Sequence, residues 1–395
     1  MTGRVSGRMR PLSILHLLSN RWWTGTAEPV LALTQGLLER RQRVSLGVPA
    51  GSPVEDLARK AGIPLLEGLQ LNPRFHPWSW LQDVRRLAAF VRRTSIDVLH
   101  VHLSHDHWLA WSATRLLNPH TQRLPLGVRT VHTVRRPRSL SNRWLLGHGA
   151  AHLIAVSSTL RQDLIERLQV PPARVTAIAG AVDSQRFHPD RSGALFRQAS
   201  AMSPTTPLVG IVARIAPSRG HLTLVEAFAQ VHAAIPAARL VIVGKGEFRP
   251  QVEQRVGELG LADAILFTGY RDDDLPEVLA ALDVFVLLAP GSEGSCRAVL
   301  EAMAVGKPVV AARVGALQEI VLDGETGLLI DPHAPTALAH AISRLLRAPE
   351  QARQMGLRGR QRTEHVFSRE RQVDAVLRLY RQLHAARYAS TTRDR

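Results

Sequence analysis

The sequence predicts an α/β protein made of two doubly wound parallel sheets. Three observations indicate this fold. The 395 residues suffice for two domains of ordinary size, short apolar runs alternate with longer amphipathic ones, and this alternation stops and restarts once near the middle. Strands that alternate with helices of about 10–15 residues form parallel βαβ units, because the crossover helix returns the chain to the same edge of the sheet.

The first half contains six candidate strands, each a short apolar run. Candidate helices lie between these runs and include residues 26–40, 78–94 and 158–169. The strands are expected at residues 13–17, 44–48, 97–101, 126–130, 152–156 and 175–178.

Residues 190–207 break the alternation with Ser, Thr and Pro, and we place the domain linker there. The predicted domains are residues 1–190 and 191–370. In the second domain we expect strands at 208–213, 240–243, 265–268, 284–287 and 309–311, and helices that include 221–232, 296–305 and 335–346.

Residues 371–395 form a last predicted helix followed by a tail. Val373, Val376, Leu377 and Tyr380 recur at helical spacing and make one apolar stripe. A helix with one apolar stripe buries it against another part of the protein.

Cysteine usage and hydropathy favour a cytoplasmic protein. Cys296 is the only cysteine, so no intrachain disulfide can form. The N-terminal apolar run of about seven residues contains His16 and lacks an Ala-x-Ala-like cleavage site, so we expect no signal peptide. No apolar stretch approaches the roughly 18 residues that span a bilayer.

The positive charge is concentrated in the first half. The net charge is +17, and residues 1–190 carry 25 Lys and Arg against 12 Asp and Glu. Such a field attracts phosphate groups, for example those of an anionic membrane or a lipid-linked substrate. A solvated, arginine-rich surface is the alternative, and the sequence leaves both open.

Two arginines follow a predicted strand of the second half. Arg214 and Arg219 lie on the loop after residues 208–213. Ligands of doubly wound sheets bind at the carboxyl edge of the strands, and two guanidinium groups there suit a diphosphate. Gly244 and Gly246 follow the next strand, where glycine lets backbone amides approach a phosphate, although a simple tight turn is the alternative.

Two glutamates give the strongest signal. Glu293 lies on the loop after the strand at 284–287, and Glu301 lies about two turns into the next helix. Glu301 falls on the apolar side of that helix, where an ionised carboxylate needs partners. Ribose hydroxyls would supply them. An ion pair, for instance with Lys307, is the alternative.

These residues resemble family-4 retaining glycosyltransferases of the GT-B fold. The family signature is two glutamates with seven residues between them, followed by a Gly-Lys-Pro-Val run, which Glu293, Glu301 and residues 306–309 match. The resemblance implies two facing Rossmann-like domains with a cleft between them, and a C-terminal helix that packs back on the first domain. Here Arg219-Gly220 stands where the family usually has Lys-Gly.

The resemblance also implies roles. Glu293 would hold the donor sugar, Glu301 the ribose, and Arg214 and Arg219 the departing diphosphate. His132 would lie near the reacting carbon, and Gly25 would contact a donor phosphate. The other expected donor-binding residues are Gly244, Gly246, Arg271, Ser295, Ala298 and Val299.

The first domain is expected to bind the acceptor. Trp22 and Trp23 could stack on a sugar ring or a lipid, or simply fill a core, and His102 and His105 are candidates on the acceptor side. The short spacing of His100, His102 and His105 suggests metal binding, but histidines at a strand end more often contact substrate or backbone. We expect neither a metal nor another cofactor.

One predicted helix is basic and amphipathic. Arg85, Arg86, Arg92 and Arg93 lie opposite an apolar side, so this helix could rest on an anionic membrane or be an ordinary solvated surface. We therefore predict a nucleotide-sugar-dependent enzyme acting on an envelope glycolipid or lipopolysaccharide precursor, in the cytoplasm or at the inner membrane face. The alternatives are a GT-B sugar-nucleotide epimerase or hydrolase, a basic nucleic-acid-binding protein and an inactive sugar-nucleotide sensor.

Overall fold

The computed structural model describes residues 10–22, 26–72, 75–117, 124–132, 140–289 and 296–393, with side chains up to residue 387. The chain divides into two compact units. The first comprises Met1–Val156, Leu160–Ile178 and Gln372–Arg395, and the second comprises Ser157–Thr159 and Ala179–Arg371.

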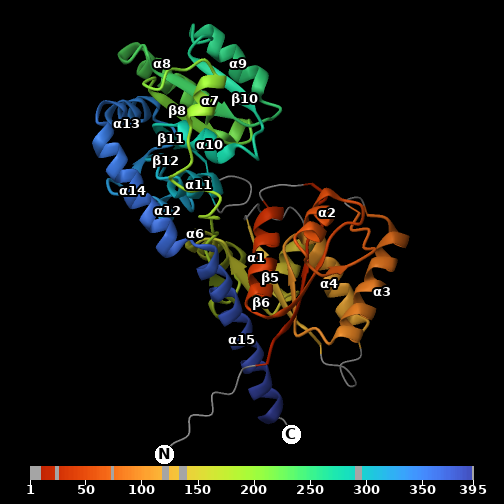
Figure 1. Cartoon of the computed structure of the whole chain (residues 1–395). Helices are drawn as coiled ribbons and strands as arrows, with labels where there is room; N and C mark the ends of the chain where they lie inside the picture. The colour runs from red at the N-terminus through yellow and green to blue at the C-terminus, as the bar shows by residue number, and fades with distance from the viewer. Residues whose placement is uncertain are drawn as a thin grey trace, which may run out of the picture. The chain divides into compact units, whose positions relative to one another are not determined.

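The first unit contains a sheet of seven parallel strands in the order β3-β2-β1-β4-β5-β6-β7 (Figure 1). The order reverses between β1 and β4, which both lie at the centre. The strands are β1 (Ser13–Leu17), β2 (Arg43–Gly47), β3 (Leu65–Leu66), β4 (Val98–Val101), β5 (Leu126–Val131), β6 (His152–Ala155) and β7 (Val175–Ala177).

Helices cover both faces of this sheet. The connecting helices are α1 (Ala27–Glu39), α2 (Pro53–Lys60), α3 (Pro77–Thr94), α4 (Ser104–Arg115), α5 (Leu140–His148) and α6 (Ser158–Leu168). Leu99 and Val101 of β4 pack with α3 and α4, whereas Val98 of β4 and Val128 of β5 pack with α1 and the C-terminal helix. Strands buried on both faces explain the continuous apolar runs in the sequence.

The C-terminal helix α15 (Arg369–Arg393) packs in the first unit from residue 372 onward. Its stripe of Val373, Val376 and Tyr380 is buried against the core of that unit. A Cβ at Gly36 of α1 would lie 2.4 Å from Val373 Cγ2, so glycine allows the two helices to approach closely.

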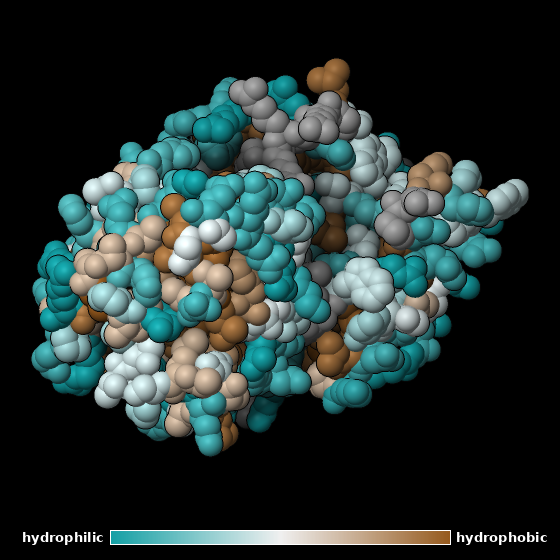
Figure 2. Space-filling model, turned by 90° about the horizontal axis from the view of Figure 1, so that it is seen from above, coloured by the Kyte–Doolittle hydropathy of each residue, from teal (hydrophilic) through white to brown (hydrophobic). Residues whose placement is uncertain are grey.

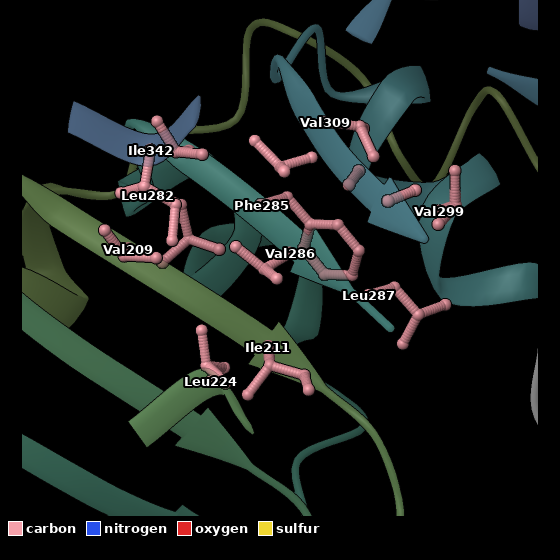
Figure 3. Close-up of a cluster of buried hydrophobic side chains, with 14 of the residues drawn as sticks. Val209, Ile211, Leu224, Leu282, Phe285, Val286, Leu287, Val299, Val309 and Ile342 are labelled. Atoms are coloured by element: carbon pink, nitrogen blue, oxygen red, sulfur yellow. The ribbon is translucent and has the colours of Figure 1, made fainter. Parts of the chain in front are cut away.

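The second unit contains six parallel strands in the order β10-β9-β8-β11-β12-β13. The order reverses between β8 and β11. The strands are β8 (Leu208–Val212), β9 (Arg239–Val243), β10 (Ile265–Gly269), β11 (Val284–Leu287), β12 (Val309–Ala312) and β13 (Gly327–Ile330). Figure 3 shows side chains of β8, β11 and β12 meeting those of the helices in one buried core. The two sheets confirm the predicted α/β class.

The helices of the second unit follow its strands in the usual alternation. They are α7 (Ala194–Ala199), α8 (His221–Ala234), α9 (Arg249–Glu258), α10 (Leu275–Ala281), α11 (Arg297–Ala304), α12 (Leu317–Ile320), α13 (Pro335–Arg347) and α14 (Pro349–Val366).

The chain passes into the second unit earlier than the sequence suggested. The division falls after residue 178, whereas the predicted boundary was residue 190. Val182, Phe187 and Phe196 belong to the core of the second unit, and Phe196 lies on α7, inside the stretch predicted as a linker. The Ser, Thr and Pro residues of that stretch obscured its buried apolar positions.

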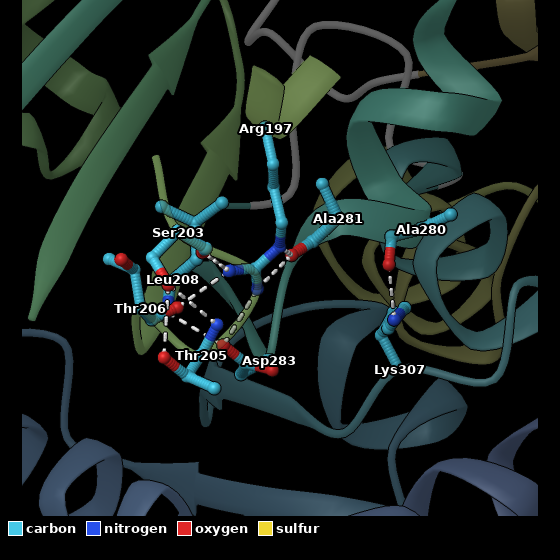
Figure 4. Close-up of polar contacts among 9 residues, drawn as sticks. All are labelled: Arg197, Ser203, Thr205, Thr206, Leu208, Ala280, Ala281, Asp283 and Lys307. Carbon is cyan, nitrogen blue, oxygen red and sulfur yellow. Dashed lines mark hydrogen bonds and ion pairs between the residues drawn. The ribbon is translucent and has the colours of Figure 1, made fainter. Parts of the chain in front are cut away.

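Arg197 holds this segment in place (Figure 4). Its guanidinium donates to the carbonyl oxygens of Ala281 at 2.6 and 3.0 Å, Ser203 at 3.1 Å and Thr206 at 2.7 Å. It also donates to Asp283 Oδ2 at 3.1 Å. These bonds tie α7 and the loop before β8 to the end of α10, so the start of β8 has a fixed position.

On the side drawn in Figure 2, hydrophilic residues cover much of the surface and hydrophobic ones gather in patches. In the described part of the chain, no helix is both long enough and apolar enough to cross a membrane.

Candidate functional site

The reversal of strand order places a candidate site in the second unit. Loops leave the carboxyl ends of β8 and β11 in opposite directions, which opens a crevice for ligands in doubly wound sheets. Arg214 and Arg219 lie on the loop after β8, and the loop after β11 leads into α11. Glu293 and Ser295 belong to residues 290–295, outside the described residues, so their predicted roles stay predictions.

Gly244 and Gly246 let the loop after β9 lie directly on the loop after β8. A Cβ at Gly244 would lie 2.0 Å from the carbonyl oxygen of Ala213, and one at Gly246 would lie 1.9 Å from that of Ile215. The Ile215 amide donates to the Lys245 carbonyl at 3.0 Å. Both glycines therefore have a packing role at the site edge, and their predicted contact with a donor remains untested.

The two arginines after β8 differ in exposure. The Arg214 side chain is 61% exposed and lies 3.7 Å from a carboxylate oxygen of Glu247. Arg219 is half-buried at the end of a short 3-10 turn, and Gly220 then adopts a φ of 76° to start α8. A Cβ at Gly220 would lie 2.7 Å from Leu288 Cβ, so this turn lies against the chain just after β11.

His221 is a candidate that sequence reasoning missed. It is the first residue of α8, is 1% exposed, and neither ring nitrogen has a hydrogen-bond partner. Burial lowers the pKa of His221 to about 4, and the positive charge of Arg219 adds to this shift. A buried imidazole without partners beside an arginine can donate a hydrogen bond to an oxygen of a bound ligand. A histidine directly after Arg-Gly at a helix start was the available signal.

Glu301 is buried, but its ion-pair partner is not the one suggested by the sequence. Its side chain is 4% exposed, and Arg297 Nε donates to Oε1 at 2.6 Å from one turn earlier on α11. Lys307 instead donates to the carbonyl oxygen of Ala280 at 2.6 Å, so the suggested Lys307 pair is wrong. Ala298 and Val299 share α11 with Glu301, half-buried and buried respectively.

The loop after β10 adds Tyr270 and Arg271. The Arg271 Nε donates to Asp274 Oδ1 at 3.1 Å, so this predicted donor contact is engaged within its own loop. Tyr270 is 57% exposed. Burial raises the pKa of Tyr270, the negative charges of Asp272 and Glu301 raise it further, and the positive charges of Arg297 and Arg186 oppose the shift. Sequence reasoning did not single out Tyr270.

Buried histidines gather at the strand ends of the first unit. His16 Nδ1 lies 3.1 Å from His102 Nε2, and the His102 and His132 ring centroids are 6.1 Å apart. Burial lowers the pKa of His132 to about 4 and that of His102 well below its usual value, and Arg129 adds to both shifts. Both imidazoles are neutral at pH 7, so each ring has one nitrogen that can donate a hydrogen bond and one that can accept one.

Asp106 fixes the loop that carries His102. Its carboxylate accepts from the backbone amides of Leu103 and Ser19, each at 2.8 Å. Burial raises the pKa of Asp106 to about 6. His105 packs edge-on against Trp80 at 5.3 Å between ring centroids, and burial lowers its pKa. His105 thus lies beside α3, and its acceptor role stays a prediction.

The histidine cluster has the composition of a metal site but limited free ligands. One ring nitrogen each from His16, His100 and His102 lies within 4.8 Å of the others. The two ring nitrogens of His100 already contact the Tyr380 hydroxyl at 2.5 Å and Thr130 Oγ1 at 2.7 Å. A metal bound by His100 would have to displace one of these contacts. The expectation that the protein uses no metal stays a prediction.

The loop after β1 is described only in part. Trp22 is 70% exposed, so it is available for stacking rather than packed in a core. Trp23 and Gly25 lie outside the described residues, and their predicted contacts with acceptor and donor stay predictions.

Known proteins match both units. The model for glycosyltransferase family 4 matches residues 23–186, and that for glycosyl transferases group 1 matches residues 194–362. A D-inositol 3-phosphate glycosyltransferase of Corynebacterium glutamicum is 30% identical over 297 residues, which cover 68% of this chain and 69% of the relative. The chain belongs to the family-4 glycosyltransferases, the glycosyl transferases group 1.

Other relatives of this family-4 glycosyltransferase align over shorter stretches. A GDP-mannose-dependent α-(1-6)-phosphatidylinositol monomannoside mannosyltransferase of Mycolicibacterium smegmatis is 33% identical over 48% of this chain and 52% of its own length. A D-inositol 3-phosphate glycosyltransferase of Salinispora tropica is 35% identical over 58% of this chain and 51% of its own length. The chain therefore spans about half the length of these relatives.

Solved structures confirm the predicted GT-B class. A glycosyltransferase from Rickettsia africae superposes with a TM-score of 0.81 over 94% of this chain and 98% of its own, at 19% identity. Anabaena HepE in complex with UDP and glucose gives 0.79 over 93% and 99%, at 21% identity. These likenesses establish the fold.

Proposed function

We propose that this protein transfers a sugar from a nucleoside-diphosphate sugar to a hydroxyl acceptor and retains the anomeric configuration. The observation that carries the proposal is the buried Glu301 carboxylate on α11, in a unit whose cationic Arg214 and Arg219 follow the neighbouring strand end. Family membership supports the reaction class, and the relatives that use GDP-mannose support a nucleotide-sugar donor.

The second unit would hold the donor. Glu301, fixed by Arg297, would accept hydrogen bonds from ribose hydroxyls, as the family resemblance implies. Arg214, Arg219 and the partnerless His221 would take the diphosphate, whose negative charge grows as the glycosidic bond breaks. Because the two arginines can stabilise the leaving group and the neutral His221 can donate a hydrogen bond to it, the proposed chemistry needs no metal ion.

Retention would follow from departure and attack on the same side of the sugar. The described residues at the strand ends of the second unit offer Glu301 as a buried carboxylate, and Arg297 already holds it. Front-face attack assisted by the leaving diphosphate requires no carboxylate nucleophile. Glu293 would bind the sugar hydroxyls in this scheme, and the neutral His132 would lie near the reacting carbon.

The acceptor would be a glycolipid or saccharide of the cell envelope, such as a lipopolysaccharide precursor. The relatives named for phosphatidylinositol mannoside and inositol phosphate act on anionic acceptors. The excess of positive charge in residues 1–190 suits such an acceptor. His102 and the exposed Trp22 are the described candidates for contacting it.

Peripheral contact with an anionic membrane is part of the proposal. On α3, Arg85, Arg86, Arg92 and Arg93 are exposed, and the side chain of Trp78 is 72% exposed at its first turn. Arginines together with an exposed tryptophan are typical of helices that rest at a membrane surface. This arrangement supports a location at the inner membrane face.

A product assay tests the reaction class. We expect the protein with UDP-, GDP- and ADP-sugars to release nucleoside diphosphate faster when a glycolipid acceptor extract is added, and to form a glycosylated lipid. An epimerase would instead yield an isomeric sugar nucleotide, and a hydrolase would release free sugar regardless of acceptor. Either of those results would replace the transferase proposal.

Donor binding can be followed separately by thermal shift. A nucleotide sugar at 100 times its dissociation constant should stabilise the fold by about 3 kcal/mol. Glu301→Ala should abolish this shift because it removes the carboxylate that accepts hydrogen bonds from the ribose hydroxyls. An unchanged shift in Glu301→Ala would remove Glu301 from the site.

A further inference from the structure

Histidines occupy the place in the first unit where its strand order reverses. The reversal lies between β1 and β4, and in doubly wound sheets the carboxyl ends of two such strands are where ligands bind. His16 near the end of β1 pairs with His100 of β4, and His102 directly follows β4. The topology therefore brings imidazoles to the position expected for a ligand of this unit.

His16 and His102 form a hydrogen-bonded pair. His16 Nδ1 lies 3.1 Å from His102 Nε2, and the side chains are 0% and 4% exposed. The other two ring nitrogens, His16 Nε2 and His102 Nδ1, are buried and have no hydrogen-bond partner among the described residues. Burial lowers the pKa of His16 to about 3 and that of His102 well below its usual value, so both rings are neutral at pH 7.

A neutral pair of this kind always presents one donor and one acceptor. Each neutral imidazole has one N–H group and one lone pair, and the bond between the rings uses one of each. If His16 donates to His102, the remaining N–H is at His102 Nδ1 and the remaining lone pair is at His16 Nε2. If His102 donates, the two roles are exchanged.

This combination selects a hydroxyl group as the partner. Buried polar groups are normally hydrogen-bonded, so both free nitrogens require one. A phosphate or carboxylate only accepts hydrogen bonds and would leave the lone pair of the pair unsatisfied, whereas an ammonium group only donates and would leave the N–H unsatisfied. A hydroxyl donates and accepts, so it can satisfy either nitrogen in either tautomeric state.

Asp106 holds the two strand ends together without using the imidazoles. Its Oδ1 accepts from the amide of Ser19, two residues after β1, at 2.8 Å. Its Oδ2 accepts from the amides of Leu103 at 2.8 Å and His102 at 3.3 Å, directly after β4. One carboxylate thus ties the loop after β1 to the loop after β4, and the free nitrogens of the histidine pair stay available to a ligand.

His132 lies beside the pair. It follows β5, its ring centroid is 6.1 Å from that of His102, and its Nε2 is also buried with no hydrogen-bond partner in the described part of the chain. In the proposed reaction His132 lies near the reacting carbon of the donor sugar. A hydroxyl held by His102 would therefore lie close to this carbon, where the attacking hydroxyl of an acceptor has to be.

We propose that the His16–His102 pair binds hydroxyl groups of the acceptor and orients the one that attacks. This inference rests on the proposed transferase function and names the acceptor side of that reaction. The hydroxyl donates to the free imidazole lone pair, so its own oxygen lone pairs point away from the ring. The bond from this oxygen to the anomeric carbon forms as the bond to the diphosphate breaks. The proton passes to the departing diphosphate, because a ring with so low a pKa holds a proton poorly at pH 7.

Nitrogen-15 NMR of the histidine-labelled full chain tests hydroxyl binding, because the shifts of ring nitrogens report which one carries the proton. The probes are methyl α-D-mannopyranoside and myo-inositol, added with UDP or GDP present. We expect saturable shifts at His16 Nε2 and His102 Nδ1 with either probe or both. The fully O-methylated mannoside cannot donate and should bind at least about 10-fold more weakly. Equal binding of the methylated compound, or no shift with either polyol, overturns the proposal and leaves buried water only.

Two substitutions remove one free nitrogen each and keep a hydrogen bond between positions 16 and 102. The Asn amide can replace Nδ1 and the Gln amide can replace Nε2, so His16→Asn and His102→Gln retain the pairing atoms. Each should raise the half-saturating concentration of the glycolipid acceptor extract at least about 10-fold and leave the donor KM within about twofold. The matched control is His152→Gln, a buried histidine at the start of β6 whose Nε2 contacts Thr176 Oγ1 at 2.8 Å. It should change neither constant.

Thermal unfolding verifies that each variant is folded, and the NMR shifts of the wild type decide the matter if neither is. Wild-type kinetics in a folded variant overturn the proposal. A raised donor KM with unchanged acceptor dependence also overturns it, because the pair would then hold the donor. Sugar transfer by the wild type without polyol shifts refutes this inference alone, whereas polyol shifts without any transfer refute the proposed function and leave hydroxyl binding by the pair in place.

Discussion

Replacing Arg214 and Arg219 together with alanine is expected to lower kcat/KM for sugar transfer by about 10³-fold or more. Removing a single preorganised donor from a site of developing negative charge costs about 10²–10³ in rate. Both arginines follow β8 at the reversal of strand order, where a diphosphate leaving group would lie. Initial rates with saturating acceptor and varied donor measure the effect.

The control for this double variant is Arg353→Ala on α14. Arg353 is 58% exposed and pairs with Glu350, which is 69% exposed, so its loss should change kcat/KM less than twofold. Unfolding without ligand should show that the double variant is folded. A folded double variant with nearly wild-type kcat/KM would mean that the diphosphate leaves elsewhere.

Acidification is expected to destabilise the protein by several kcal/mol between pH 7 and pH 5. Burial lowers the pKa of His16 and His107 to about 3 and that of His132 to about 4, against 6.5 for an ordinary histidine. Below pH 6.5 the unfolded chain binds protons at these positions and the folded chain does not, so stability falls as pH falls. Each imidazole contributes on the order of 1–2 kcal/mol over this interval.

Asp106 opposes this effect in part. Burial raises its pKa to about 6, so the folded state gains a proton there as the pH falls from 7 to 5, and this offsets about one imidazole. Urea unfolding at pH 7 and pH 5 measures the net change. His132→Asn should reduce the pH dependence, while His333→Asn at an exposed position should leave it unchanged. Equal free energies of unfolding at both pH values would contradict this expectation, because they would mean that the folded protein binds protons at these histidines as readily as the unfolded chain does.

The sequence predicted the central strands well because burial on both faces makes each a continuous apolar run. It missed β3, which has two residues, and β13, which is a four-residue Gly-Leu-Leu-Ile run. Apolar runs this short cannot be told from a loop by their pattern. The linker was misplaced because Phe196 stands among polar residues and only its packing shows that it is core.

Sequence motifs predicted some residues of the candidate site. They could not predict the features that depend on how distant segments pack together. From their order in the chain, Arg214 and Arg219 could be assigned to the end of a strand and Glu301 to the interior of the helix after the next central strand. The Arg297–Glu301 pair was accessible in principle, since the two residues are four apart on one helix. The missing partners of His221 depend on segments that are distant in sequence.

The central claim is that a nucleoside diphosphate binds at the carboxyl ends of β8 and β11. A crystal structure of the protein with UDP or GDP tests it most directly. We expect the diphosphate within hydrogen-bond distance of Arg214 and Arg219, and the ribose hydroxyls within hydrogen-bond distance of the Glu301 carboxylate. A nucleotide bound elsewhere, with Glu301 still paired only to protein groups, would contradict the claim.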